Sequence, residues 1–147
     1  MKKVAILMLS LCWFLCGCAG GISFNQIKLE HINSFEGQKV YFFRNYEQYA
    51  EYVGNISAEH QLTEPFADRL NAYKEGYFTN NYLVLFFYRG PSTDSVKIKR
   101  ILLIDNTASL EVKVKDRRAS SADINQRVFF VEIEKVYDII DASVKYI

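Results

Sequence analysis

The sequence has few of the residues that build disulfides, metal sites and thiol nucleophiles. Its three cysteines all lie near the start of the chain: Cys12, Cys16 and Cys18. The long remainder has no thiol, so a domain formed by it must be held together by its core alone. The two histidines, His31 and His60, lack the spacing of metal ligands. We therefore expect no metal and no cofactor.

Catalytic motifs are missing as well. The chain has no G-x-S-x-G nucleophile motif, and no G-K-[ST] of a phosphate loop follows Gly90 and Pro91. Closely spaced carboxylates are interpreted as surface charges: Glu132 with Glu134, and Asp138 with Asp141. The sequence thus predicts that the protein is not an enzyme and has no catalytic residue.

Neither charge is in strong excess, because 18 Lys and Arg stand against 17 Asp and Glu. A domain that binds nucleic acid is usually strongly basic. We therefore expect no nucleic-acid partner.

The chain also lacks an apolar run long enough to span a bilayer. The longest run, residues 4–15, is shorter than the roughly 20 residues that a spanning helix needs. It follows Lys2 and Lys3, as in a secretory signal peptide, and it ends in the lipobox-like stretch Leu15-Cys16-Gly17-Cys18. We predict that residues 1–17 are a cleaved signal peptide. The alternative is an apolar N-terminal helix that is not cleaved.

Cys18 is the predicted lipidation site. Its thiol accepts a diacylglyceryl group, and small Gly17 lets the signal peptidase reach the bond before it, whereas bulky Phe14 and Leu15 precede Cys16. Two acyl chains suffice for stable anchoring. Membrane lipid is thus an expected partner, at the extracytoplasmic face of the cell membrane or envelope. Residues 18–21 form a short tether, and residues 22–147 form a single domain.

Two helices are expected in the first half of this domain. Asn45 is a good N-cap and forms a capping-box-like pair with Gln48. An apolar face follows, and we expect the helix to stop at Gly54, before a loop over residues 55–62. Thr63 and Pro65 indicate a second helix start. Its apolar face holds Phe66, Leu70 and Tyr73, and Gly76 ends it.

Strands dominate the rest of the chain. Residues 82–88 are apolar throughout, which is typical of a central strand covered on both faces. Further strands are predicted at residues 24–32, 39–44, 96–104, 110–115, 128–134 and 143–147. Short turns between strands favour antiparallel pairing. The predicted fold is α+β, with two helices packed on a largely antiparallel sheet of about five to seven strands.

Lysines alternate with apolar residues in two of these strands. A hairpin around residues 105–109 places four of them on one face, namely Lys97, Lys99, Lys113 and Lys115. In one interpretation this is an ordinary solvated face, neutralised by Glu132 and Glu134 on a neighbouring strand. In the other it contacts anionic lipid headgroups or an acidic partner.

Aromatic residues are abundant, with ten tyrosines and eleven phenylalanines. Three tyrosines fall on the first predicted helix: Tyr46, Tyr49 and Tyr52. They either pack in the core with hydroxyls at its rim, which we favour, or mark a contact surface.

The second half of the chain resembles the C-terminal domain of the PrcB family of protease complex subunits. The resemblance rests on Phe78 and on the strand patterns at residues 83–85, 90–98, 110–114 and 130–135. Thr93-Asp94-Ser95 stands where the family has a Thr-Gly-Gly-Tyr-like stretch. The resemblance implies a protein-binding module that stabilises or restrains a protease, and it implies no catalytic residue.

Together these features predict a lipid-anchored, non-catalytic binding module for an exported protein such as a protease. Its contact surface would be the lysine face together with the loop that holds Gly90, Pro91 and Thr93. The alternatives are a structural envelope lipoprotein that lies on the membrane through its basic face, and a small lipid-anchored enzyme.

Overall fold

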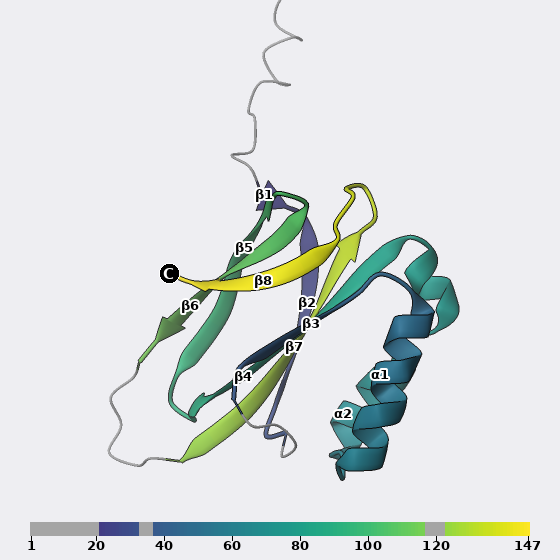
Figure 1. Ribbon diagram of the computed structural model, residues 1–147. Coiled ribbons are helices and arrows are strands. Elements are labelled where there is room, and N and C mark those ends of the chain that lie inside the picture. The colour runs from purple at the N-terminus through teal and green to yellow at the C-terminus, as the bar shows by residue number, and fades with distance from the viewer. Residues whose placement is uncertain (1–20, 33–36, 117–122) are drawn as a thin grey trace, which may run out of the picture.

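The computed structural model describes residues 21–32, 37–116 and 123–147, so the predicted signal peptide and Cys18 lie outside the described residues. The described residues form eleven elements (Figure 1). In chain order they are β1 (Gly21–Ile22), β2 (Phe24–Glu30), β3 (Lys39–Phe43), α1 (Tyr46–Glu59), α2 (Glu64–Ala72), the 3₁₀ helix η1 (Glu75–Thr79), β4 (Asn81–Pro91), β5 (Ser95–Ile104), β6 (Thr107–Lys115), β7 (Ile124–Glu134) and β8 (Asp141–Tyr146). In the described part of the chain, none of the helices has the length and apolar character needed to cross a bilayer.

The strands form two four-stranded sheets. One has the order β2-β7-β4-β3 and is here called the β4 sheet, and the other has the order β1-β5-β6-β8 and is called the β5 sheet. All neighbours are antiparallel except β6 and β8, which are parallel. The helices lie on one side of the β4 sheet and the β5 sheet on the other, so the molecule has three layers (Figure 1).

The α+β class and its two helices are confirmed. The single sheet of five to seven strands is corrected, because the described residues contain eight strands divided between two sheets. After β4, the chain leaves its sheet at Pro91, and β5 and β6 pair in the other layer.

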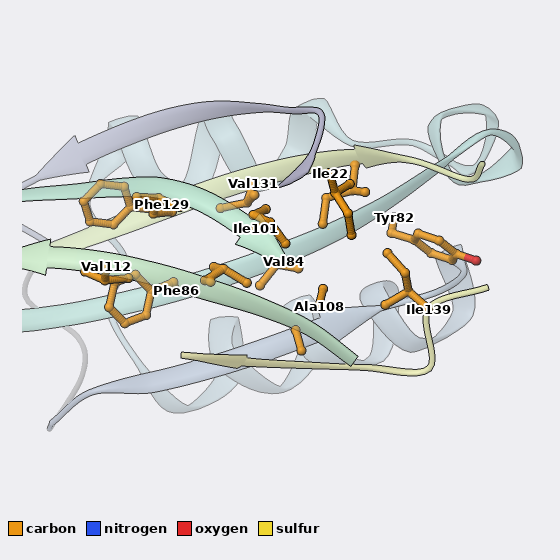
Figure 2. Close-up of a cluster of buried hydrophobic side chains, with 14 of the residues drawn as sticks. Ile22, Tyr82, Val84, Phe86, Ile101, Ala108, Val112, Phe129, Val131 and Ile139 are labelled. Atoms are coloured by element: carbon orange, nitrogen blue, oxygen red, sulfur yellow. The ribbon is translucent and has the colours of Figure 1, made fainter. Parts of the chain in front are cut away.

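Strand β4 has a buried residue at every position from Tyr82 to Tyr88, as predicted for a strand covered on both faces. It lies inside its sheet, between β7 and β3. Tyr82, Val84 and Phe86 pack against the β5 sheet in one core cluster (Figure 2). The alternate residues Leu83, Leu85 and Phe87 pack against the helices in a second cluster. Two apolar faces on one strand thus hold three layers together.

Helix α1 begins as predicted and ends later than predicted. The Asn45 side chain accepts a hydrogen bond from the backbone N–H of Gln48 at 2.9 Å, and the Gln48 side chain accepts one from the N–H of Arg44 at 3.0 Å. The helix continues through Gly54 to Glu59. Ile56 explains this, because it is buried seven residues, or about two helical turns, after Tyr49 and so lies on the same face. Packing of that turn outweighs the cost of about 1 kcal/mol for a glycine inside a helix.

The tyrosines of α1 belong to the core, as we favoured. Tyr49 is buried, and its hydroxyl donates to the carbonyl of Leu70 at 2.6 Å. Tyr46 and Tyr52 are half-buried against the same cluster. In α2, Phe66 and Leu70 are buried on the predicted face, with Tyr73 just after the helix.

Candidate interaction surface

The four predicted lysines converge on the face of the β5 sheet that points away from the core. Lys97 is paired directly with Lys113, and Ser95 with Lys115. Together with Lys99 they line a hollow of about 120 Å³. All four lysine side chains are exposed. The hollow lined by Ser95, Lys97, Lys99, Lys113 and Lys115 is called the lysine hollow below.

A β-bulge shapes this surface. The register of β5 against β6 shifts between Ile98 and Arg100, so Lys99 has no direct partner on β6. Ile98 and Ile101 are buried, and the two residues between them are exposed. The bulge thus places two consecutive basic residues, Lys99 and Arg100, on the outer face and returns the strand to its apolar alternation. The alternating sequence pattern predicted the lysine face and gave no sign of the bulge.

The charge of this face is only partly balanced. Glu111, 3 % exposed, accepts a hydrogen bond from Arg100, and the Lys145 ammonium lies 3.9 Å from its other oxygen. The hydrogen bond from Arg100 and the two positive charges lower the pKa of Glu111 below its ordinary value of 4.5. The Glu111 carboxylate therefore already interacts with two cations, Arg100 and Lys145. Within the described ranges, the four lysines of the hollow form no ion pair.

The predicted neutralisation by Glu132 and Glu134 is wrong. Both belong to β7 in the β4 sheet, with a core layer between them and the lysines. The carboxylate of Glu132 instead accepts a hydrogen bond from the Tyr73 hydroxyl at 2.8 Å. Like charges directly opposite each other destabilise a sheet, and among the described residues neither Lys97 nor its partner Lys113 forms an ion pair that offsets this.

Glu111 gives a prediction about pH. Because its pKa is lowered in the folded state, the ionised carboxylate stabilises the fold at pH values above 4.5, and this stabilisation is lost as the pH falls through the lowered value. A Glu111→Gln variant should unfold at lower urea concentration than wild type at pH 7, and the difference should shrink at pH 3. An equal difference at both pH values would contradict this assignment. Glu51→Gln, on the exposed side of α1, is the matched control.

The loop after β4 adjoins the lysine hollow at Ser95. Gly90 and Pro91, which were predicted in this loop, are the last residues of β4 and pair with β7. Gly90 is required there, because a Cβ would lie 2.7 Å from the Tyr88 ring. Pro91 is exposed and Thr93 is half-buried. The Tyr88 hydroxyl donates to the Asp94 carboxylate at 2.8 Å. Burial, together with this hydrogen bond, raises the pKa of Tyr88 to about 12.

Arg127 fixes this loop to the body of the domain. It is 2 % exposed, and its guanidinium donates to the carbonyls of Pro91 at 3.3 Å and Ser92 at 2.9 Å. It also lies over the Tyr88 ring and 3.5 Å from the Glu30 carboxylate. Sequence reasoning missed Arg127. Its position at the start of an apolar strand was a signal for such a role. An arginine buried there must have partners, because arginine is rarely buried without them.

Two other features of the described residues were candidate sites, a second hollow and a histidine. A second, open hollow of about 410 Å³ is lined by Asn45, Tyr46, Glu47, Glu75, Phe78 and Thr79. Its carboxylates, Glu47 and Glu75, are exposed. No group of three or more metal-binding side chains occurs in the part of the chain that the structure describes. His31 lies at a strand end, where its backbone N–H donates to the Asn125 side chain at 2.9 Å.

Comparison of the chain with known protein families, curated proteins and solved structures found no match. The resemblance to the PrcB family therefore stays a prediction.

Proposed function

We propose that the protein is a lipid-anchored, non-catalytic binding module that holds an acidic surface of another exported protein, such as a protease, on its lysine hollow. The observation that carries this proposal is the convergence of four exposed lysines without an ion pair among the described residues. Clustered charge of one sign gives specificity and fast association with a partner of the opposite sign.

The position of the hollow favours a protein partner over the membrane. Gly21, the first described residue, pairs with Leu102 on β5. Lys97 lies five residues further from that point along the same strand, which corresponds to about 16 Å. Two residues separate Cys18 from Gly21, and the three Cα–Cα steps between them span at most about 11 Å. The lysine hollow therefore begins at Lys99, three residues along β5 from the point at which the tether enters, and extends away from that point.

The test is crosslinking and pull-down of the native lipoprotein from its own membranes. The test variant carries Lys97→Glu, Lys99→Glu, Lys113→Glu and Lys115→Glu. We expect wild type to capture one acidic exported protein, and capture to fall by on the order of tenfold or more in this variant, because attraction becomes repulsion. Raising the salt concentration should weaken capture, since exposed charges are screened over about 8 Å at 0.15 M ionic strength.

The matched control reverses two exposed lysines elsewhere, Lys39→Glu in β3 and Lys74→Glu after α2. Capture that survives reversal of the hollow, or that is lost equally in the control, would contradict the proposed surface. If the purified protein instead binds anionic vesicles through the four lysines and captures no protein, the alternative of a structural lipoprotein lying on the membrane takes its place.

A further inference from the structure

Most of the exposed large apolar side chains of the described residues gather at one end of the molecule. They come from the β5–β6 hairpin and from the connection between β7 and β8, and comprise Leu103, Ile104, Val136, Tyr137 and Ile140. Their exposed fractions run from 37 % for Leu103 to 69 % for Val136. These five residues are called the apolar tip.

One hydrogen bond joins the two segments of the tip, and a second ties the β7–β8 connection to β4. The backbone N–H of Ile140 donates to the carbonyl of Asn106 at 2.9 Å, and the hydroxyl of Tyr82, in β4, donates to the carbonyl of Tyr137 at 3.0 Å. Ile139 is fully buried in the core between the sheets (Figure 2). The connection thus has a buried isoleucine next to an exposed one. The hydrogen-bonded backbone directs the Ile139 side chain into the core and leaves the Ile140 side chain exposed.

The apolar tip lies at the end of the domain where the tether enters. Gly21 pairs with Leu102, which directly precedes Leu103 of the tip. In Figure 1, strand β1, the β5–β6 turn and the β7–β8 connection all lie at the top of the molecule. The short reach from Cys18 keeps Gly21 within about 11 Å of the predicted lipid-bearing residue.

We propose that the apolar tip inserts into the interfacial region of the bilayer that carries the lipid anchor, and so orients the domain with its lysine hollow away from the membrane. This inference rests on the proposed lipid anchoring. Contiguous apolar side chains on a soluble domain mark an interaction site. An amphipathic ring such as Tyr137 is favoured at the level of the lipid headgroups.

Charged residues around the tip set the depth of this contact. Asp138 lies 3.2 Å from the Arg44 guanidinium in an ion pair. Asp105 stands at the turn, where it and Asn106 have positive φ values of 48° and 59°. An ionised carboxylate stays in water or among headgroups, because its transfer to hydrocarbon is costly. The tip therefore reaches the headgroup level and not the middle of the bilayer.

The test places an environment-sensitive fluorophore on a single introduced cysteine. Acylation of Cys18 blocks the one remaining native thiol once residues 1–17 are removed. One protein carries Ile140→Cys at the tip, and the matched control carries Lys113→Cys in the lysine hollow. Each full lipoprotein is placed in vesicles of phosphatidylethanolamine and phosphatidylglycerol. We expect the emission of the probe at 140 to shift to shorter wavelength and to be quenched by lipids with quencher groups, while the probe at 113 emits as in water.

Equal emission from the two positions would overturn the inference, as would a shift at 113 alone, which indicates a domain lying on its lysine face. Adding Ile104→Ser and Val136→Ser to the protein labelled at 140 should remove its shift without unfolding it, because both side chains are exposed. The mass of the purified mature protein reports lipidation separately. A lipidated protein without a shift at 140 refutes only the tip contact, and an unlipidated protein refutes the proposed anchor.

Discussion

Replacing Phe130 by alanine should lower the free energy of unfolding by about 3–5 kcal/mol, the usual cost of truncating a buried aromatic residue. Phe130 is fully buried in β7. Its ring packs edge-on against Phe66 at 6.0 Å between centroids and is stacked on Tyr73 at 5.8 Å. The substitution removes a side chain that packs against both α2 and the segment after it. The cavity it leaves is lined by rigid rings, which limits collapse.

Urea unfolding followed by circular dichroism measures this loss. Typical domains have only about 5–15 kcal/mol of stability, so the transition should move to much lower urea concentration. Tyr137→Ala is the matched control, because its ring is 45 % exposed and its hydrogen-bonded carbonyl is retained. We expect a change within about 0.5 kcal/mol for this control. Equal effects of the two substitutions would contradict the assignment of Phe130 to the core.

Phe129→Ala tests the other apolar layer independently. The adjacent residue Phe129 points to the opposite face of the β4 sheet and stacks on Phe86 at 5.6 Å. We therefore expect Phe129→Ala to lower the free energy of unfolding by about as much as Phe130→Ala, although the two side chains lie in different core clusters. A two-layer protein with one core would show this loss at only one of the two positions.

The central strand could be predicted from the sequence because its signal is local. Residues 82–88 contain no polar break, and a strand without such a break is covered on both faces. The division into two sheets could not be predicted in this way. It depends on which strand pairs with which, for example the parallel pairing of β6 with β8, and periodicity along one segment carries no information on its partner.

The end of α1 shows where a local signal fails. Gly54 is a helix-stopping residue by propensity, but the buried side chain of Ile56 lies two residues beyond it. Helix propensity is a weak preference that tertiary packing overrides. Ile56 could have indicated the longer helix, since it lies seven residues after Tyr49 and therefore continues the same apolar face.

The lysine hollow could be predicted only in part. The alternation along each strand placed the lysines on one face, but which acidic residues lie beside them depends on how the strands pair. Glu111, which lies on the same strand as Lys113, pairs with Arg100 and Lys145, whereas Glu132 lies in the other sheet. The bulge at Lys99 and the loop contacts of Arg127 arise from tertiary geometry, so no spacing rule reveals them.

Replacing Cys18 by alanine should move the protein almost completely from the membrane fraction to the soluble extracytoplasmic fraction. The predicted anchor is two acyl chains, and each buried CH₂ contributes about 0.8 kcal/mol to membrane binding. The apolar tip cannot replace them. Its five side chains are already partly buried in the folded domain, and their full burial is worth only about 1.5–3 kcal/mol each. Contact through the tip alone is therefore weak and reversible, as with a single acyl chain.

Fractionation with immunoblotting, and the mass of the mature chain, measure this effect. Cys16→Ala is the matched control, because Cys16 lies within the predicted signal peptide, and its loss should leave both lipidation and cleavage unchanged. If Cys18→Ala stays in the membrane fraction and Cys16→Ala is released, the cleavage site has been misplaced by two residues. The tether would then have four residues between the lipid-bearing cysteine and Gly21 in place of two. A tether of that length reaches up to about 18 Å, which loosens the link between the anchor and the apolar tip and makes the orientation of the domain depend on the tip contact alone.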